Sequence, residues 1–379
     1  MLRLIIFALV WLFLCGLSAS QNPSLRSQKT DLELRGPSPH KTEDSVSTNS
    51  ISSPILGYVF DPAHGGLRPI KGILGASTLG EVLPLRRKLS HAQVSAQQEY
   101  ALVVTADTQE AQLLPLNLRS EDYLLRPIAG TKSGISRIAL SPTGSSAALF
   151  YSERRSVQVI TALPTSPLAD EEIDISAVPG SLTAMAISDD TSAILLGVSD
   201  QTLGAVYSLR RGGEVRWITS VDDASAISFM SRTHDALIAD RQANEVLLIS
   251  DVLGAIKKTV LVGQSEGLLG PIAVESSEDN QRVFIADSGS NSIYSLELAS
   301  GTVTHFSSRR PLAGLFRLRG KSIFRVTELT GQPILLFDGG AELRAFFVPV
   351  EQARFASGGE SVLPERGQSR PIRVPRRRN

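Results

Sequence analysis

The chain of 379 residues has one cysteine and no net charge. Lysine plus arginine equals aspartate plus glutamate, at 38 each, so the folded surface has no global field that would recruit nucleic acid or an acidic membrane. The cysteine, Cys15, lies in a segment that we expect to be removed. The mature chain would then form no disulfide and have no thiolate chemistry.

Histidine is also scarce, with five in the chain. A zinc or copper site needs several converging ligands, and at best one histidine, His91, falls where it could face a central site. HExxH, CxxC and phosphate-binding glycine motifs are absent. The sequence therefore predicts no catalytic constellation, no metal site and no cofactor.

The N-terminus has the pattern of a secretory signal. A basic start at Arg3 precedes an unbroken apolar run over 4–14, and small residues follow at 16–20. Because this run is too short to span a bilayer comfortably, we predict a cleaved signal peptide over 1–20, with an uncleaved anchor as the alternative. Residues 21–53 are polar and without period, which predicts a disordered spacer. An exported chain without disulfides favours a bacterial source.

Beyond the spacer, short apolar runs alternate with clusters of Gly, Ser, Asp and Asn, which predicts many short strands. Six segments repeat one pattern, an apolar strand, a polar turn and a second strand. The last apolar residue of each first strand serves as an anchor, and the spacings between anchors are 46, 47, 42, 45 and 44 residues. The anchors are Val94, Leu140, Ile187, Phe229, Val274 and Leu318.

An acidic residue ends each second strand, and an apolar residue stands six positions beyond it in a third strand. The acids are Asp107, Glu153, Asp200, Asp240, Asp287 and Glu328. The apolar residues are Leu113, Val159, Val206, Val246, Ile293 and Ile334. A short carboxylate at a strand end accepts backbone N–H bonds and stabilises the next turn, so we interpret the acids as a structural device of the repeat. A ring of cation sites is the alternative.

A third strand, a turn and a fourth strand complete each unit, as in 294–306. Four antiparallel strands in a repeat of this length predict an all-β fold, a β-propeller, because blades around an axis cover each other's apolar faces. Small residues precede the anchor in four of the first strands, where a propeller narrows toward its axis. They are Ala139, Ala186, Ser228 and Ala273.

We expect seven four-stranded blades within residues 54–350. Residues 58–71 match the third and fourth strands of a unit, and strands within 351–379, near Phe355 and Val362, would complete that blade and close the ring. Residues 72–89 fit no blade position. Six blades with a docked N-terminal hairpin is the alternative. The basic end of the chain, 370–379, is expected to be a solvated, disordered tail.

Residues 270–306 read GPIAVESSEDNQRVFIADSGSNSIYSLELASGTVTHF. This segment closely resembles the YVTN-type β-propeller repeat, and the looser copy at 239–244 is also similar to the NHL repeat. The resemblance covers about 290 residues at varying strength. It implies an exported seven-bladed propeller. It implies no single activity, because such repeats serve binding proteins, lactonase-like enzymes and lyases.

Loops from every blade meet at the mouths of a propeller channel, where ligands and partners commonly bind. If the residue three before each anchor faces the axis, only two blades place a polar side chain there, His91 and Arg137. Four charged residues stand just before other first strands. The candidate channel-mouth site is therefore His91, Arg137, Asp222, Asp223, Glu266 and Arg310, and ordinary solvated charges are the alternative.

The sequence favours an exported binding or scaffolding module, periplasmic or extracellular and monomeric, with a protein, glycan or small molecule as its ligand. Nucleic acid is not an expected partner, and no transmembrane segment is expected in the mature chain. One alternative is a lactonase-like or lyase-type enzyme with its site at the channel mouth. Another is a structural component of the cell envelope.

Overall fold

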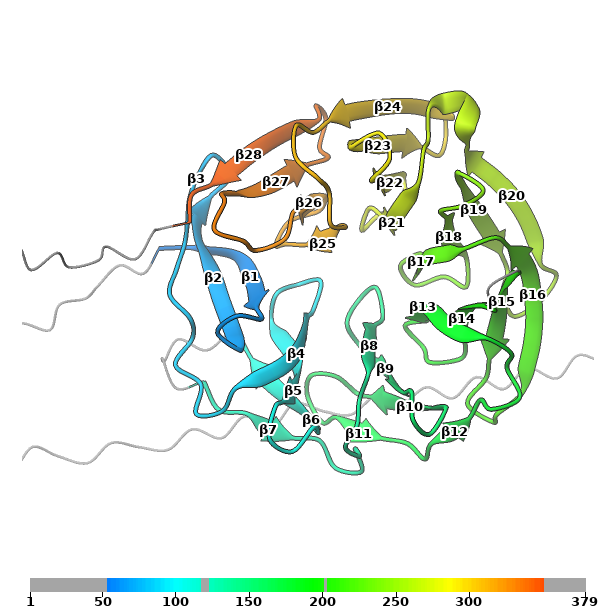
Figure 1. Cartoon of the computed structure of the whole chain (residues 1–379), viewed down its shortest axis with the longest axis horizontal. Helices are drawn as coiled ribbons and strands as arrows, with labels where there is room; N and C mark the ends of the chain where they lie inside the picture. The colour runs from blue at the N-terminus through cyan, green and yellow to red at the C-terminus, as the bar shows by residue number, and fades with distance from the viewer. Residues whose placement is uncertain (1–52, 117–122, 201–202, 351–379) are drawn as a thin grey trace, which may run out of the picture. The chain divides into compact units, whose positions relative to one another are not determined.

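The computed structural model describes residues 53–116, 123–200 and 203–350. These residues form an all-β ring of seven sheets around an axis (Figure 1). The predicted seven-bladed propeller is confirmed, and the alternative with six blades and a docked hairpin is wrong. The segments expected to be a signal, a spacer and a C-terminal tail lie outside the described residues. Within the described part of the chain, no helix is long and apolar enough to cross a membrane.

Neighbouring strands in every sheet are antiparallel, and their order in the sheet follows their order in the chain. In blade 3 the outer position is shared by two short strands, β11 and β12, which both pair with β10. A short 3-10 helix, η1 (Gln264–Glu266), lies between blades 5 and 6. The blades are blade 1, β1 (Ile55–Asp61), β2 (Gly66–Ile73) and β3 (Ala76–Leu79); blade 2, β4 (Leu89–Val94), β5 (Tyr100–Thr105), β6 (Ala111–Pro115) and β7 (Arg126–Pro127); blade 3, β8 (Arg137–Leu140), β9 (Ala147–Tyr151), β10 (Ser156–Thr161), β11 (Leu168–Ala169) and β12 (Ile173–Asp174); blade 4, β13 (Ser181–Ile187), β14 (Ile194–Ser199), β15 (Gly204–Leu209) and β16 (Val215–Val221); blade 5, β17 (Ala224–Phe229), β18 (Ala236–Asp240), β19 (Glu245–Ser250) and β20 (Lys257–Val262); blade 6, β21 (Pro271–Ser276), β22 (Arg282–Asp287), β23 (Ser292–Glu297) and β24 (Thr302–Ser307); and blade 7, β25 (Phe316–Arg317), β26 (Ile323–Arg325), β27 (Ile334–Asp338) and β28 (Arg344–Val348).

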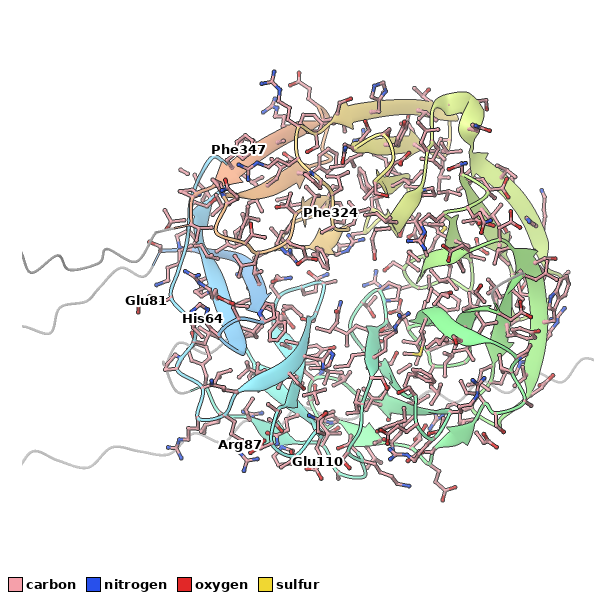
Figure 2. All side chains as sticks on the ribbon, in the orientation of Figure 1. His64, Glu81, Arg87, Glu110, Phe324 and Phe347 are labelled. Atoms are coloured by element: carbon pink, nitrogen blue, oxygen red, sulfur yellow. The ribbon has the colours of Figure 1, made fainter. Side chains whose placement is uncertain are left out.

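The core of the ring is divided into seven apolar clusters, each between two neighbouring blades. Side chains alternate between the two faces of a strand, so a middle strand supplies one cluster with its odd positions and the next cluster with its even positions. Ile285 of β22 faces blade 5, for example, whereas Phe284 faces blade 7. Figure 2 shows Phe324 inside blade 7 and Phe347 on its outer strand. Every sheet therefore buries both faces, which a lone blade could not do.

The six repeat units have the predicted order of strands. Five of the six predicted anchors end or directly follow their inner strand, and the sixth, Val274, lies within β21. Each apolar residue six positions beyond an acid lies in the third strand of its blade. All six of those third-strand residues are buried, at 2% exposure or less. The spacing rule therefore located three of the four strands in six blades.

The strand-end acids of blades 5 and 6, Asp240 and Asp287, stabilise turns as we interpreted them. Asp287 is fully buried, and its Oδ1 accepts hydrogen bonds from the backbone amides of Gly289 (2.9 Å) and Ser290 (3.3 Å) in the following turn. Its Oδ2 accepts from the amide of Leu269 (2.5 Å), which precedes the inner strand of the same blade. Asp240 makes the same two kinds of bond, to Ala243 on one side and to Asp222 and Asp223 on the other.

Blade 1 corrects one prediction. The hairpin at 58–71 does not supply third and fourth strands, because β1, β2 and β3 occupy the second, third and fourth positions. Asp61 ends β1 and accepts hydrogen bonds from the amides of Ala63 (3.1 Å) and His64 (3.2 Å), as a second-strand acid does. Leu67, six positions beyond it, is buried in β2. β3 comes from the segment that fitted no blade position, and no described strand fills the inner position of blade 1.

The ring closes between blade 7 and blade 1. Val59, Ile70 and Leu79 of blade 1 pack in one cluster with Leu336 and Val348 of blade 7, among others. The outer strands β3 and β28 also meet there, with the amide of Leu79 donating to the carbonyl of Pro349 (3.4 Å). The predicted closing strands within 351–379 lie outside the described residues.

Candidate functional site

The turns that join inner strands to second strands lie at one end of the ring, which we call the turn face. Side chains tie neighbouring turns together there. One carboxylate oxygen of Asp189 accepts from the amide (2.8 Å) and hydroxyl (2.6 Å) of Thr143, and the other accepts from the amide of Arg232 (2.8 Å). The side-chain amide of Asn280 accepts from the backbone amide of Ser231 (3.0 Å) and donates to the carbonyl of Ser231 (2.8 Å). These bonds connect blades 3 to 6, so the rim of the turn face has a fixed shape.

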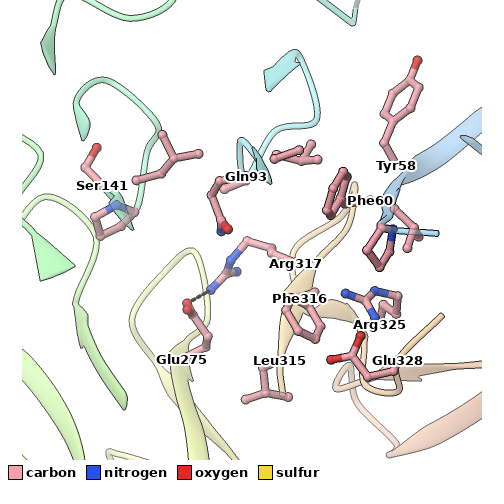
Figure 3. Close-up of a pocket in the computed structure, with 17 residues that line it drawn as sticks. Tyr58, Phe60, Gln93, Ser141, Glu275, Leu315, Phe316, Arg317, Arg325 and Glu328 are labelled. Carbon is pink, nitrogen blue, oxygen red and sulfur yellow. Dashed lines mark hydrogen bonds and ion pairs between the residues drawn. The ribbon is translucent and has the colours of Figure 1, made fainter. Parts of the chain in front are cut away.

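A cavity of about 280 Å³ lies on the axis, in front of β1 and between the inner strands of blades 2 and 7. We call it the axial cavity. Tyr58 and Phe60 of β1 line one side, and Gln93 of β4 and Arg317 of β25 line the flanks. Figure 3 shows Arg317 reaching across to Glu275 of β21. The cavity therefore lies where blade 1 has no inner strand among the described residues.

A second pocket, of about 360 Å³, opens at the turn face and shares four lining residues with the axial cavity. We call it the mouth pocket. Its walls carry hydroxyls and charges of both signs, and none of its lining residues is aromatic. The shared residues are Ala96, Pro142, Glu275 and Arg317, and the polar walls are Gln97, Glu99, Thr143, Ser231, Arg232, Ser276, Ser277 and Glu278.

Arg317 and Glu275 form an ion pair between the two pockets. Arg317 Nη2 lies 3.1 Å from Glu275 Oε2, and the side chains are 17% and 33% exposed. The same guanidinium donates to the carbonyl of Ser276 and lies over the ring of Phe324, with 5.1 Å from Cζ to the ring centroid. Partial burial reduces screening by salt, so the pair holds blades 6 and 7 in register more firmly than an exposed pair would.

Arg325 is a buried cation in the wall of the axial cavity. Its Cζ lies 3.8 Å from the centroid of the Phe316 ring, and its guanidinium donates to the carbonyl of Thr327. Burial lowers the pKa of Arg325 to about 10, although the nearby charge of Glu328 opposes this shift. Arg325 thus stays charged at neutral pH and is stabilised by an aromatic face and a carbonyl.

Gln98 joins three blades at the turn-face end of the axial cavity. Its Oε1 accepts from the amide of Tyr58 (2.9 Å), and its Nε2 donates to the carbonyls of Arg317 (2.8 Å) and Ser95 (3.1 Å). The side chain is buried, at 1% exposure. Its amide group therefore satisfies the turn-face end of the inner edge of β1.

The six residues of the predicted site do not gather in either pocket. His91 is exposed and contacts Ser90, whereas Arg137 donates to the carbonyl of Thr183 in the next blade. Burial lowers the pKa of Arg137. As a candidate binding site this set stays a prediction.

The four charged residues of that set precede inner strands and bond locally. The amide of Asp222 donates to Asp240, and Asp223 pairs with Arg241 at 2.6 Å. Glu266 accepts from the amide of Gly263. Arg310 donates to the carbonyl of Pro333 and lines a separate pocket of about 350 Å³ in blade 7.

Sequence reasoning missed Gln93 and Arg317, although a signal for them exists. Four inner strands have Ala or Ser directly before the anchor, whereas blades 2 and 7 have these two long polar residues. Blades 2 and 7 are the neighbours of blade 1. The two departures from the small-residue rule therefore mark the cavity beside blade 1, the blade without a described inner strand.

Comparisons with known proteins support the fold. No family model matches the chain, and neither does any curated protein. A functionally unknown protein from Desulfotomaculum acetoxidans is similar in structure, with a TM-score of 0.54 and 14% identity over 79% of this chain and 100% of that one. A protein from Lactobacillus plantarum has a TM-score of 0.50 and 11% identity over 78% of this chain and 96% of its own. At these identities the likeness extends to the fold alone.

Proposed function

We propose that this chain is an exported, non-enzymatic binding module that holds a charged loop of a protein partner in the mouth pocket. The single observation that carries the proposal is the mouth pocket itself, a polar hollow on the axis bounded by turns of blades that are bonded to one another. A β-propeller fits a binding or scaffold module because its rigid blades fix the positions of many loops around one opening. The N-terminal pattern and the YVTN-like segment support the exported location.

The chemistry of the mouth pocket favours a protein partner over a sugar. Glu99 and Glu278 are exposed acids, and Arg232 is an exposed base. Side chains of both signs at fixed positions select a partner with complementary charges, and such pairs contribute specificity and association rate. A pocket without an aromatic face offers no stacking surface for a sugar ring.

A photo-crosslinking amino acid placed at exposed Gln97 in the mouth pocket tests the proposal in cells that make the protein. The matched control is the same amino acid at exposed Glu110, on the outer margin of the ring (Figure 2). We expect a defined protein adduct from position 97 only. The double variant Arg232→Glu, Glu278→Lys leaves the net charge unchanged and should abolish that adduct without lowering the melting temperature. Equal adducts at both positions, or an adduct that survives the double variant, would contradict the proposal.

A further inference from the structure

We infer that residues 353–358 of this chain fill the inner-strand position of blade 1, antiparallel to β1. The site would be the inner edge of β1, and its ligand a short extended segment of the chain itself. This inference stands independently of the partner proposed above. It rests on the open edge of β1, on the path of the chain between blades and on the spacing after β28.

The inner edge of β1 is only partly satisfied. The carbonyl of Leu56 accepts from the amide of Arg319 (2.9 Å), and the amide of Tyr58 donates to Gln98 (2.9 Å). Hydrogen-bonding directions alternate along a strand, so the backbone groups of Phe60 face this same edge. Among the described residues they have no partner there, and Phe60 borders the axial cavity. An unpaired strand edge beside a cavity is a site for strand addition.

The path of the chain leads to this position. In each of the other six blade-to-blade steps, the outer strand of one blade is followed by the inner strand of the next after two to nine residues. β28 is the outer strand of blade 7 and ends at Val348. A connection of two to nine residues after Val348 would place the start of an inner strand of blade 1 between residues 351 and 358. Such a strand would begin beside the Phe60 end of β1 and run antiparallel to it, toward the turn face.

The sequence in this window suits the position. Arg354 and Phe355 repeat the order of Arg317 and Leu318 in the inner strand of blade 7. Ala353, Ala356 and Ser357 are small, as the narrow axis requires. The anchor would be Phe355, which would cover apolar groups that the axial cavity now exposes.

Asp61 differs from the corresponding acids of blades 5 and 6 in the partners of its second carboxylate oxygen. In blades 5 and 6 the second carboxylate oxygen of Asp240 and Asp287 accepts an amide from the segment that precedes the inner strand. In blade 1 the corresponding oxygen, Oδ2 of Asp61, accepts instead from the exposed ring of His64 (2.8 Å) and lies 3.7 Å from Nη1 of Arg68. If the inner strand followed the geometry of blades 5 and 6, a backbone amide near residue 351 would donate to this oxygen.

The N-terminal segment is the competing occupant, and the structure argues against it. The carbonyl of Pro54 accepts from the amide of Gly72 (2.7 Å), near the turn between β2 and β3, away from the axis. Figure 1 shows the chain reaching β1 from the outer side of the ring, beside the end of β28. A tight hairpin from an inner strand into β1 would require the chain to enter β1 from the axis of the ring.

Cysteine pairs in the full chain test the inference, with Cys15 replaced by Ser. Phe60→Cys is combined in turn with a cysteine at each position from 353 to 358, and in control chains with a cysteine at each position from 46 to 51. Strand pairing predicts an intramolecular disulfide at the one position of the first set that lies directly opposite residue 60, because positions two residues away are too distant to be bridged. Disulfides with the 46–51 set, bonds only between molecules, or no bond at any position would overturn the inference.

Hydrogen exchange of the otherwise unmodified chain gives a second readout that does not depend on Phe60→Cys. We expect the amide of Phe60 to be protected, and to exchange at least tenfold faster in the variant Phe355→Asp, Ala356→Pro. The matched control is Gln368→Pro, later in the C-terminal segment, which should leave that amide unchanged. An amide of Phe60 that exchanges freely in the parent chain, or equally in both variants, would contradict the inference.

Discussion

At the scale of single residues, the strand-end acids contribute unequally because their burial differs. Asp287 is buried and accepts three backbone amides, whereas Asp107 is exposed and accepts one, from Thr108. Removing a buried charged acceptor leaves several donors without partners. We predict that Asp287→Ala lowers the free energy of unfolding by about 3 kcal/mol or more, and that Asp107→Ala has a much smaller effect. Urea unfolding of the two variants measures both values, and equal losses would contradict the structural role.

Buried tyrosines make the fold sensitive to alkali. Burial, with a smaller effect of nearby Tyr123, raises the pKa of Tyr58 to about 12, and burial also raises the pKa of Tyr100. Below pH 10 both groups are protonated in the folded and unfolded chain. Above that pH the unfolded chain releases the protons while the folded chain retains them, so the free energy of unfolding should fall between about pH 10 and pH 12.

Chemical denaturation at pH 9, 10.5 and 11.5 measures this slope. We expect the Tyr58→Phe, Tyr100→Phe double variant to lose less stability over this range than the parent chain. It should already be weaker at pH 9, because hydroxyl bonds to the carbonyls of Leu116 (3.1 Å) and Gly144 (2.6 Å) are lost. The control Tyr207→Phe removes a tyrosine elsewhere in the ring. If the free energy of unfolding of the double variant falls with pH as steeply as that of the parent chain, the alkaline loss belongs to other groups.

At the scale of elements, the inner edge of β1 depends on one side chain. Gln98→Ala would leave the amide of Tyr58 and the carbonyl of Arg317 without their bonds in a buried place. We predict a loss of about 2–4 kcal/mol in the free energy of unfolding and faster hydrogen exchange at the Tyr58 amide. The neighbouring Gln97→Ala, at an exposed position, should change neither. Similar behaviour of the two variants would mean that Gln98 does not hold this edge.

The elements also show what could be predicted from the sequence. Six blades followed from the spacing of anchors and acids, because each blade buries the same strand positions. Blade 1 was misassigned since it has no described inner strand to set the frame, although Asp61 and Leu67 obey the acid rule.

The site was harder to predict than the strands. Gln93 and Arg317 could have been found as exceptions to the small-residue rule. The burial of Arg325 against Phe316 could not, because it depends on how β25 and β26 pack.

At the scale of the whole molecule, the question is whether the ring unfolds as one unit or opens at the junction of blades 7 and 1. Ile70 is fully buried in the cluster at this junction, and Ile285 is fully buried in the cluster between blades 5 and 6. Each change to Ala removes the same atoms and should cost about 2–5 kcal/mol. Because every blade needs both neighbours to cover its faces, we predict a single calorimetric transition for both variants, lowered by similar amounts. A separate early transition in Ile70→Ala alone would show that the junction opens before the rest of the ring.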